Sequence, residues 1–332
     1  MKRSIRKVLA LLLVTASICA LVVSATALAN DTTINIGSPK NNVPIAENLE
    51  YTTFKGVALT GKFKALDPDG DTLSFEIVAA PKKGSVSPTQ NGEFVYTPAE
   101  GKKGKDTFKY VAVDSLGGVS ASATVTVNIN KQSSKTTYAD MDGNDALYAA
   151  LVLTENGIFT GEKLGGEYFF RPEQTITRGE FLAMCLSLTN TETITGITKT
   201  GFADDADIPM WAKPYVSAGL MNGVVGGYRN GAGQLVFSPN EPITFTEAAV
   251  ILNRSLGITD VVGAAAIPVD SVPAWAQSAA VNLAACNILP NGLSAVAKDT
   301  LTRADAARLL LNSMEVLAAR DTGGGGLLSW AR

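Results

Sequence analysis

A short motif that combines a hydroxyl, a cation and an acid recurs three times in the second half of the chain. The copies are Thr177-Arg178-Gly179-Glu180, Thr244-Phe245-Thr246-Glu247 and Thr302-Arg303-Ala304-Asp305. Each copy stands before an apolar helical pattern, so the threonine and the acid three residues later predict a capping box at a helix start. Glu180 and Glu247 fit this geometry well, and Asp305 is shorter.

The arginines of this motif are not explained by capping, because a cation at the first helical position opposes the helix macrodipole. One interpretation is a side chain that is solvated or paired with a nearby acid. The other is an anion site, in which Arg178 or Arg303 and the helix-start amides together bind a carboxylate. Both interpretations remain open from the residues alone.

Three aspartates, Asp67, Asp69 and Asp71, fall in one turn-forming segment. Because Ca²⁺ takes about six to eight oxygen ligands, the segment is a candidate calcium site, with Glu47 and Asp114 expected nearby in the fold. The alternative is a solvated Asp-Gly turn, whose residues recur for backbone reasons. We expect no requirement for any other cofactor.

The chain contains no histidine. This excludes Ser-His-Asp and Cys-His catalysis and the usual zinc sites. Cys185 and Cys286 lie in apolar helical patterns and are interpreted as core residues, with a single disulfide left open. Since no activated nucleophile or acid/base pair is visible, the predicted activity is binding and not enzymatic turnover.

The N-terminus, residues 1–29, is typical of a secretory signal peptide. Four basic residues precede an apolar stretch from Val8 to Val23, and Ala27-Leu28-Ala29 supplies a small-x-small cleavage site. A retained anchor fits less well, because small residues dominate the end of the stretch. A lipoprotein is disfavoured by the bulky Ile18. Residues 30–41 are then an N-terminal segment of a secreted chain.

Removal of this signal takes four of the 28 basic residues and none of the 31 acidic ones, which leaves a net charge of −7. Such a chain has no general attraction to nucleic acid or to anionic lipid. No later apolar run approaches the roughly 18 residues that a membrane helix needs. We therefore expect neither a nucleic-acid partner nor a membrane partner after cleavage.

Residues 42–129 predict a β domain. Apolar and polar residues alternate over 72–78, 92–96, 107–113 and 121–129, with glycine-containing turn signals between these runs. Several short strands without a helical stretch predict an antiparallel, all-β sandwich. The polar residues 130–137 predict a linker.

Four segments of the β region are distinctive, namely Leu66-Asp67-Pro68-Asp69-Gly70-Asp71-Thr72-Leu73, Gly92-Glu93-Phe94-Val95-Tyr96-Thr97-Pro98, Asp106-Thr107-Phe108-Lys109-Tyr110 and Asp114-Ser115-Leu116-Gly117-Gly118. With these segments the region resembles the cadherin-like, immunoglobulin-like modules of bacterial surface proteins over about residues 42–130.

From Tyr138 the pattern changes to helices, in three approximate copies at residues 138–200, 201–262 and 263–320. Apolar residues at i, i+3, i+4 and i+7 follow each capping motif and predict core-facing stripes. Tandem units of this kind bury their apolar faces against their neighbours. Residues 321–332, which include four consecutive glycines, predict a flexible tail.

A second recurring piece combines aspartate, tryptophan and glycine. Its members are Asp140, Asp204, Asp270, Trp211, Trp275, Gly157, Gly161, Gly223 and Gly226. The aspartates either cap turns or contact a ligand. The tryptophans either belong to the core or keep their N–H for a partner.

Together the two pieces resemble S-layer homology domains over about residues 138–320, with 202–258 as the closest copy. The resemblance implies three helix-loop-helix units in an all-α, pseudo-threefold module. It also implies that grooves between the units bind secondary cell-wall polysaccharide, often through an acidic, pyruvylated sugar. The ligand-contacting arginine of the family corresponds to Arg178 and Arg303, and the residues of the second piece join them as glycan-binding residues.

The sequence departs from the family pattern in each copy. Phe245 replaces the arginine of the second copy, so a groove that depends on it should be weak or silent. The third copy lacks the Gly-x-x-Gly turn and the Phe-x-Pro entry to its last helix, and the first copy lacks the tryptophan. We therefore expect one or two working grooves.

The predicted function is non-covalent anchoring of a secreted protein at the cell surface. The partner would be secondary cell-wall polysaccharide or a peptidoglycan-linked glycan, and the β module would project as a spacer or adhesion unit. In the alternative, the chain is a lattice-forming S-layer protein that also contacts other surface-layer proteins, and wall binding is only its anchor.

Overall fold

The computed structural model describes residues 41–89, 92–259, 272–289 and 300–321. The expected signal peptide, Asp270 and nearly all of the expected tail lie outside the described residues. The described chain divides between Gln132 and Ser133 into a β unit and a helical unit, and each is described by itself.

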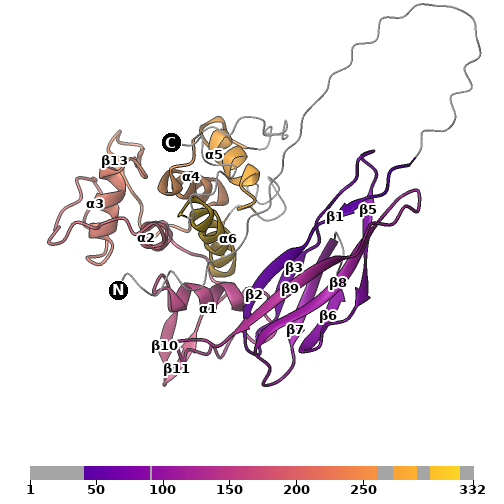
Figure 1. Ribbon diagram of the computed structural model, residues 1–332. Helices are drawn as coiled ribbons and strands as arrows, with labels where there is room; N and C mark the ends of the chain where they lie inside the picture. Colours follow the sequence, from indigo (N-terminus) through magenta and orange to yellow (C-terminus); the bar gives the residue numbers. More distant parts are fainter. Residues whose placement is uncertain (1–40, 90–91, 260–271, 290–299, 322–332) are drawn as a thin grey trace, which may run out of the picture. The chain divides into compact units, whose positions relative to one another are not determined.

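The β unit contains nine strands among the described residues (Figure 1). They are β1 (Ile45–Ala46), β2 (Leu49–Phe54), β3 (Leu59–Lys62), β4 (Ala65–Leu66), β5 (Leu73–Ala79), β6 (Gly84–Pro88), β7 (Glu93–Pro98), β8 (Gly104–Asp114) and β9 (Ala123–Asn130). One sheet has the order β2-β9-β8-β5, the other has the order β3-β7-β6, and β1 pairs with β4.

Both sheets contribute side chains to one core, which is the arrangement predicted for a sandwich. The core residues are Leu49, Leu59, Phe63, Phe94, Tyr96, Phe108, Tyr110, Ala123, Val125, Val127 and Ile129. Along β9 the buried residues alternate with half-buried ones, because successive side chains of a strand point to opposite faces. The prediction of a purely antiparallel sandwich needs one correction, since β2 runs parallel to β9.

The strands that the sequence did not predict are short or lack alternation. The glycine-containing signals between residues 78 and 92 predicted turns, but one of them, Gly84, begins β6 and pairs with Pro98. A Cβ atom at Gly84 would lie 2.5 Å from the carbonyl oxygen of Thr97 and 2.7 Å from the ring of Tyr96. The glycine therefore permits close approach of two strands, and does not mark a turn.

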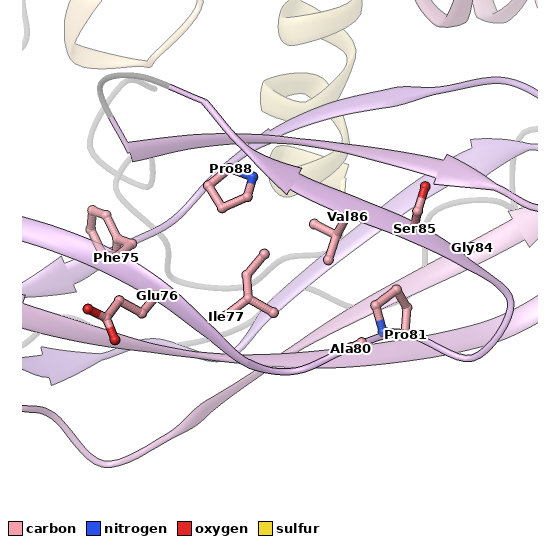
Figure 2. Close-up of a pocket in the computed structure, with 9 residues that line it drawn as sticks. All are labelled: Phe75, Glu76, Ile77, Ala80, Pro81, Gly84, Ser85, Val86 and Pro88. Atoms are coloured by element: carbon pink, nitrogen blue, oxygen red, sulfur yellow. The ribbon is translucent and has the colours of Figure 1, made fainter.

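The edge strands β5 and β6 belong to different sheets and leave a cleft of about 620 Å³ between them (Figure 2). Figure 2 shows Ile77 and Val86 facing each other across this gap, with Pro88 and Pro81 beside them. Glu76 is the only charged residue among its lining residues, so the cleft is an open, mainly apolar sandwich edge.

The helical unit contains six described helices, in three pairs (Figure 1). They are α1 (Leu147–Glu155), α2 (Arg178–Leu188), α3 (Lys213–Met221), α4 (Phe245–Leu256), α5 (Ala274–Ala285) and α6 (Arg303–Asp321). Each predicted repeat holds one pair. No helix among the described residues is both long enough and apolar enough to cross a membrane.

The predicted capping boxes start the second helix of each pair. Thr177 and Glu180 form a complete box on α2, and Thr244 and Glu247 form one on α4. At α6 the amide of Asp305 donates to the hydroxyl of Thr302 at 3.1 Å, and the amide of Thr302 donates to the Asp305 carboxylate at 3.3 Å. The longer distance agrees with the shorter acid.

The helix pairs close into a ring. The second helix of each pair packs on the first helix of the next, as α2 on α3, α4 on α5 and α6 on α1. The residues before the three caps close a smaller ring of backbone hydrogen bonds. Ile176 N–H donates to the Leu301 carbonyl (3.0 Å), Leu301 N–H to the Ile243 carbonyl (2.9 Å) and Ile243 N–H to the Ile176 carbonyl (3.0 Å).

The resemblance implied an all-α module, but the helical unit also contains strands. Two short hairpins lie between the helices of the first two pairs, β10 (Glu162–Leu164) with β11 (Glu167–Phe169) and β12 (Tyr228–Arg229) with β13 (Leu235–Val236). Strands of two or three residues are too short to show alternation in a sequence.

The predicted linker is held to the helical unit at its C-terminal end. The amides of Ser133 and Ser134 donate to the carboxylate of Glu155, at 2.9 and 2.6 Å. Thr136 is buried. The chain is therefore anchored on α1 several residues before the first repeat was expected to begin.

Candidate functional site

Arg178 lies at the junction between the first and second repeats. Its Nε donates to the carbonyl oxygen of Phe237 at 3.0 Å, and its Nη1 donates to Glu247 Oε1 at 2.8 Å. The guanidinium carbon is 5.3 Å from the centroid of the Phe237 ring and 6.0 Å from that of Tyr228. The arginine at the start of α2 is thus buried against the capping acid of the next repeat.

The helix-start amides do not supply the anion site that the sequence suggested. The amide of Arg178 donates to the carbonyl of Glu241, and that of Gly179 donates to the carbonyl of Pro239, both at 3.0 Å. The third helical amide donates to the Thr177 hydroxyl. Because the next repeat and the cap occupy these donors, an anion at this junction would meet the guanidinium alone.

Arg303 repeats this arrangement at the junction between the third and first repeats. Its Nη2 donates to Glu180 at 3.4 Å, and its Nη1 donates to the Phe170 carbonyl at 3.4 Å and to Glu162 at 3.2 Å. Its guanidinium carbon is 5.3 Å from the centroid of the Phe159 ring. Unlike Nε of Arg178, its buried Nε has no hydrogen-bond partner among the described residues.

The two described aspartates of the second recurring piece organise the backbone. Asp140 accepts from the amides of Phe170 and Arg171, at 2.9 and 2.7 Å. Asp204 accepts from the amides of Phe237 and Ser238 in the same way. Arg171 and Ser238 both have a positive φ, 57° and 55°, so each aspartate holds a strained turn at a junction.

The glycines also have backbone roles. Gly157 and Gly223 follow α1 and α3 with φ of 68° and 70°, as helix-terminating glycines do. A Cβ at Gly161 would lie 2.4 Å from the carbonyl oxygen of Phe169. The residue equivalent to Gly161 in the second repeat is Gly227 and not the predicted Gly226, because a Cβ at Gly227 meets the matching carbonyl of Val236 at 2.6 Å.

The two tryptophans are not core residues. Trp211 is 52% exposed and Trp275 is 61% exposed. Trp211 lies just before α3, and Trp275 lies in the first turn of α5, so each stands at the start of the first helix of its repeat. Their exposed rings are available for stacking on a partner. Cys185 is buried and Cys286 is half-buried, and the two do not form a disulfide with each other.

A cleft of about 400 Å³ lies beside Arg178, where Tyr228 forms part of its lining. Ser238, Asp207 and Glu241 also line it. Hydroxyl and carboxylate groups of this kind bind the hydroxyls of a sugar through hydrogen bonds. The acids make the cleft unsuited to an anionic group away from the guanidinium.

The three aspartates of the β unit come together, and their carboxylate oxygens lie within 4.8 Å of one another. Oδ1 of Asp67 accepts from the amides of Asp69 and Asp71, and both oxygens of Asp69 accept from Asn42. Oδ2 of Asp67 and Oδ1 of Asn41 are buried without a hydrogen-bond partner among the described residues. These unpartnered oxygens fit a hard cation such as Ca²⁺.

Asp114 is not part of this group. Its Oδ1 accepts from the amides of Leu116 and Gly118, and its Oδ2 accepts from the side chain of Asn41 at 2.9 Å. The hydrogen bond from Asn41, together with those from the backbone, holds the pKa of Asp114 below its usual value. The side chain of Glu47 is exposed and also stands outside the cluster.

Comparison with known proteins identifies both parts of the chain. The family model described as bacterial cadherin-like domain matches residues 41–131, and the model described as S-layer homology domain matches residues 137–182 and 201–249. The S-layer homology matches fall in the first two predicted repeats.

Two curated proteins are similar to the chain. A surface-layer 125 kDa protein of Lysinibacillus sphaericus is 30% identical over 124 residues, which cover 37% of this chain and 10% of that protein. An amylopullulanase of Thermoanaerobacterium thermosulfurigenes is 26% identical over 304 residues, which cover 85% of this chain and 15% of the enzyme. The chain therefore matches only a small part of each relative.

Among solved structures, the SrpA adhesin of Streptococcus sanguinis is 16% identical to the chain, with a TM-score of 0.23. The match covers 30% of this chain and 66% of that one. The family matches are more informative: residues 41–131 are a bacterial cadherin-like domain, and S-layer homology sequence follows it between residues 137 and 249.

Proposed function

We propose that this chain anchors itself on a bacterial cell surface by binding secondary cell-wall polysaccharide without covalent attachment and without turnover. S-layer homology sequence and similarity to part of a surface-layer protein support the surface role. The observation that carries the binding mode is the pair of buried arginines, each placed at a junction between repeats. A guanidinium is a strong hydrogen-bond donor to a carboxylate, such as that of a pyruvylated sugar.

The proposal includes residues 263–320 as a third S-layer homology repeat in a pseudo-threefold module. The closed order of helix packing and the ring of hydrogen bonds through Ile176, Ile243 and Leu301 support this, because equivalent residues make equivalent contacts. At the remaining junction the position of the arginine is taken by Phe245, which is buried. We therefore assign acid binding to the Arg178 and Arg303 junctions and not to the junction of Phe245.

The Arg178 and Arg303 junctions each offer a guanidinium, and Trp211 and Trp275 supply exposed aromatic faces in the second and third repeats. An indole ring stacks on the apolar face of a sugar and keeps its N–H for a hydroxyl. Several weak sites on one module then add by avidity. The cadherin-like domain would serve as a spacer or an adhesion unit.

The proposal is tested by co-sedimentation of the mature chain with purified, protein-free cell walls, before and after removal of their secondary polysaccharide. We expect binding to be lost on removal. Trp211→Ala and Trp275→Ala should each weaken binding severalfold, and Met221→Ala is the matched control because that side chain is 75% exposed. Equal sedimentation with stripped walls would place the target in peptidoglycan.

Arginine substitutions need a folding control, because both arginines also connect repeats. Arg178→Gln and Arg303→Gln should weaken wall binding while circular dichroism and the melting temperature show a folded chain. Absence of binding to either kind of wall would refute anchoring. It would favour the alternative function, a lattice-forming surface protein, which is tested by sheet assembly of the purified chain.

We further propose that the cadherin-like domain binds Ca²⁺ through Asp67, Asp69, Asp71 and the side-chain oxygen of Asn41. Two buried oxygens, on Asp67 and Asn41, have no hydrogen-bond partner in the described part of the chain, and they favour this over a solvated turn. Calcium would supply charge neutralisation in the cluster. It would also give Asn41, whose side-chain nitrogen already donates to Asp114, a second contact with the domain.

Calorimetry and thermal unfolding test the calcium proposal. With a dissociation constant near the 10⁻⁴–10⁻³ M of extracellular modules, 10 mM Ca²⁺ should stabilise the domain by about 1.4–2.7 kcal/mol. Asp67→Asn should abolish this effect, because the amide keeps the turn acceptor but removes the charge. Glu76→Gln, an exposed change on β5, is the control. Equal stabilisation of the wild type and Asp67→Asn would refute the site.

A further inference from the structure

The two arginine junctions differ in the hairpin residue that faces the arginine. Gly161 and Gly227 are equivalent, since each has a positive φ and each lies against the carbonyl of a paired strand. The residue after each glycine is therefore equivalent too, and it is Glu162 in the first repeat and Tyr228 in the second. An acid faces Arg303 where a phenol faces Arg178.

Glu162 bridges two arginines. Its Oε1 accepts from Arg303 Nη1 at 3.2 Å, and its Oε2 lies 3.0 Å from Arg171 Nη2. At the other junction the equivalent of Arg171 is Ser238, whose hydroxyl is hydrogen bonded to that of Tyr228. The Arg303 junction thus holds a carboxylate between two guanidinium groups, which is the arrangement that an external carboxylate would need.

The exposed fractions of the side chains show that Glu162 controls the access of an external acid to Arg303. The side chain of Arg303 is 6% exposed, and those of Glu162 and Arg171 are 39% and 45% exposed. An acid from solvent reaches Arg303 only after a neighbour moves. Glu162 is the contacting carboxylate with the greatest solvent access, since Glu180 is 25% exposed and is held in the capping box of α2.

The hydrogen bonding of Arg303 is incomplete with Glu162 in place. Its contacts are 3.2–3.4 Å long, and its buried Nε has no partner among the described residues. At the other junction Nε of Arg178 donates to a carbonyl at 3.0 Å. An unpaired buried donor of a charged group is costly, so an additional acceptor at Arg303 would be stabilising.

We propose that Glu162 is a built-in competitor for the acidic group of the wall glycan at the Arg303 junction. This inference rests on the proposed function and adds its regulation. The ligand carboxylate displaces that of Glu162, takes the position between Arg171 and Arg303, and leaves Glu162 to solvent. The Arg178 junction, with Tyr228 in the equivalent position, binds without this competition.

The competition has a predictable size. If Glu162 covers the two arginines for about 80–90% of the time, the apparent affinity of the junction falls about five- to tenfold. Glu162→Gln keeps the shape of the side chain and removes its charge, so it should recover that factor. Glu167→Gln is the matched control, because Glu167 lies exposed on the other strand of the hairpin and the change in net charge is the same.

The test measures binding of the full mature chain to immobilised secondary polysaccharide, either native or with its carboxyl groups reduced to alcohols. The Arg178→Gln background isolates the Arg303 junction. We expect Glu162→Gln to tighten binding to the native polysaccharide about five- to tenfold, and neither glutamine variant to change binding to the reduced polymer. The double variant Glu162→Gln/Arg303→Gln should lose the gain.

The outcomes separate this inference from the function on which it rests. If the parent chain binds and Glu162→Gln binds equally well, or no better than Glu167→Gln, Glu162 is not a competitor and anchoring stands. Weaker binding by Glu162→Gln would make Glu162 a ligand contact, which also overturns the inference. If no variant binds the polysaccharide, the anchoring function fails and the inference fails with it.

Discussion

At the scale of single residues, most of the side chains that suggested a glycan site hold the protein together. Asp140 and Asp204 accept backbone amides at two strained turns. The arginines bind carbonyl groups and capping acids of neighbouring repeats. Among the described side chains of this set, the two tryptophans are the ones plainly exposed to a partner. A residue that recurs in a tandem array is therefore first a candidate for a structural contact between one repeat and the next.

Gly227 gives a test of this structural role. Its φ is 65°, and a Cβ would lie 2.5 Å from the ring of Phe202, whereas Gly226 has open space around its Cβ position. Gly227→Ala should cost about 2–4 kcal/mol of unfolding free energy, through backbone strain and overpacking. Gly226→Ala should stay within about 0.5 kcal/mol. Urea unfolding of both variants checks this, and equal losses would show that the repeats are misaligned by one residue.

Asp106 gives a pH-dependent prediction in the β unit. Burial opposes its ionisation, but hydrogen bonds from the Tyr96 hydroxyl and from the amides of Lys82, Lys83 and Thr107 outweigh burial and lower its pKa. A lowered folded-state pKa stabilises the fold above the unfolded-state pKa, near 4, and this contribution is lost as the pH falls further.

Asp106→Asn should therefore destabilise the β unit at pH 7 by about 1–3 kcal/mol, because an amide meets donors that need a carboxylate. The difference from the wild type should shrink as the pH falls from 4 towards the folded-state pKa. Urea unfolding at pH 7, 4 and 3 measures it. A difference that is constant with pH would mean that packing, and not charge, makes Asp106 important.

At the scale of elements, features that depend on a few neighbouring residues could be predicted, and features that depend on pairing with another segment could not. The capping boxes at Thr177 and Thr244 could be read from four residues, because a cap depends only on its own turn. The hairpin that carries Glu162 could not, because its strands have three residues. The choice of Gly226 in place of Gly227 was an error that spacing could have prevented. Gly161 follows Gly157 by four residues, as Gly227 follows Gly223, and the contact with the paired strand agrees.

The capping box of α4 gives the prediction at this scale. Thr244→Ala removes the hydroxyl that accepts from the Glu247 amide, and should cost about 1 kcal/mol. Thr244→Ser keeps the hydroxyl and should cost far less. Thermal unfolding compares them. If serine is as destabilising as alanine, the methyl group of Thr244 contributes through packing and the cap contributes little.

At the scale of the whole molecule, the order of the repeats along the chain does not show that the helix pairs close into a ring. A tandem array read from sequence predicts contacts between neighbours, namely the first repeat with the second and the second with the third. In the helical unit α6 also packs on α1, and Arg308 forms an ion pair with Asp145 just before α1. The partners of Arg303 were unpredictable for the same reason, since Glu162 and Glu180 lie in the repeat farthest away along the chain.

Closure of the ring predicts that removing the last repeat exposes the first one. A chain that ends at Thr259 lacks α5 and α6, so α1 loses its packing partner although nothing near it in sequence has changed. We expect the amides of α1 to exchange with solvent hydrogen at least about tenfold faster than in the full chain. A chain that begins at Ser133 lacks only the β unit and is the control, in which α1 should keep its protection. Unchanged exchange of α1 in the shortened chain would mean that the repeats act as a linear array, and that the Arg303 junction forms without contributing to the stability of the first repeat.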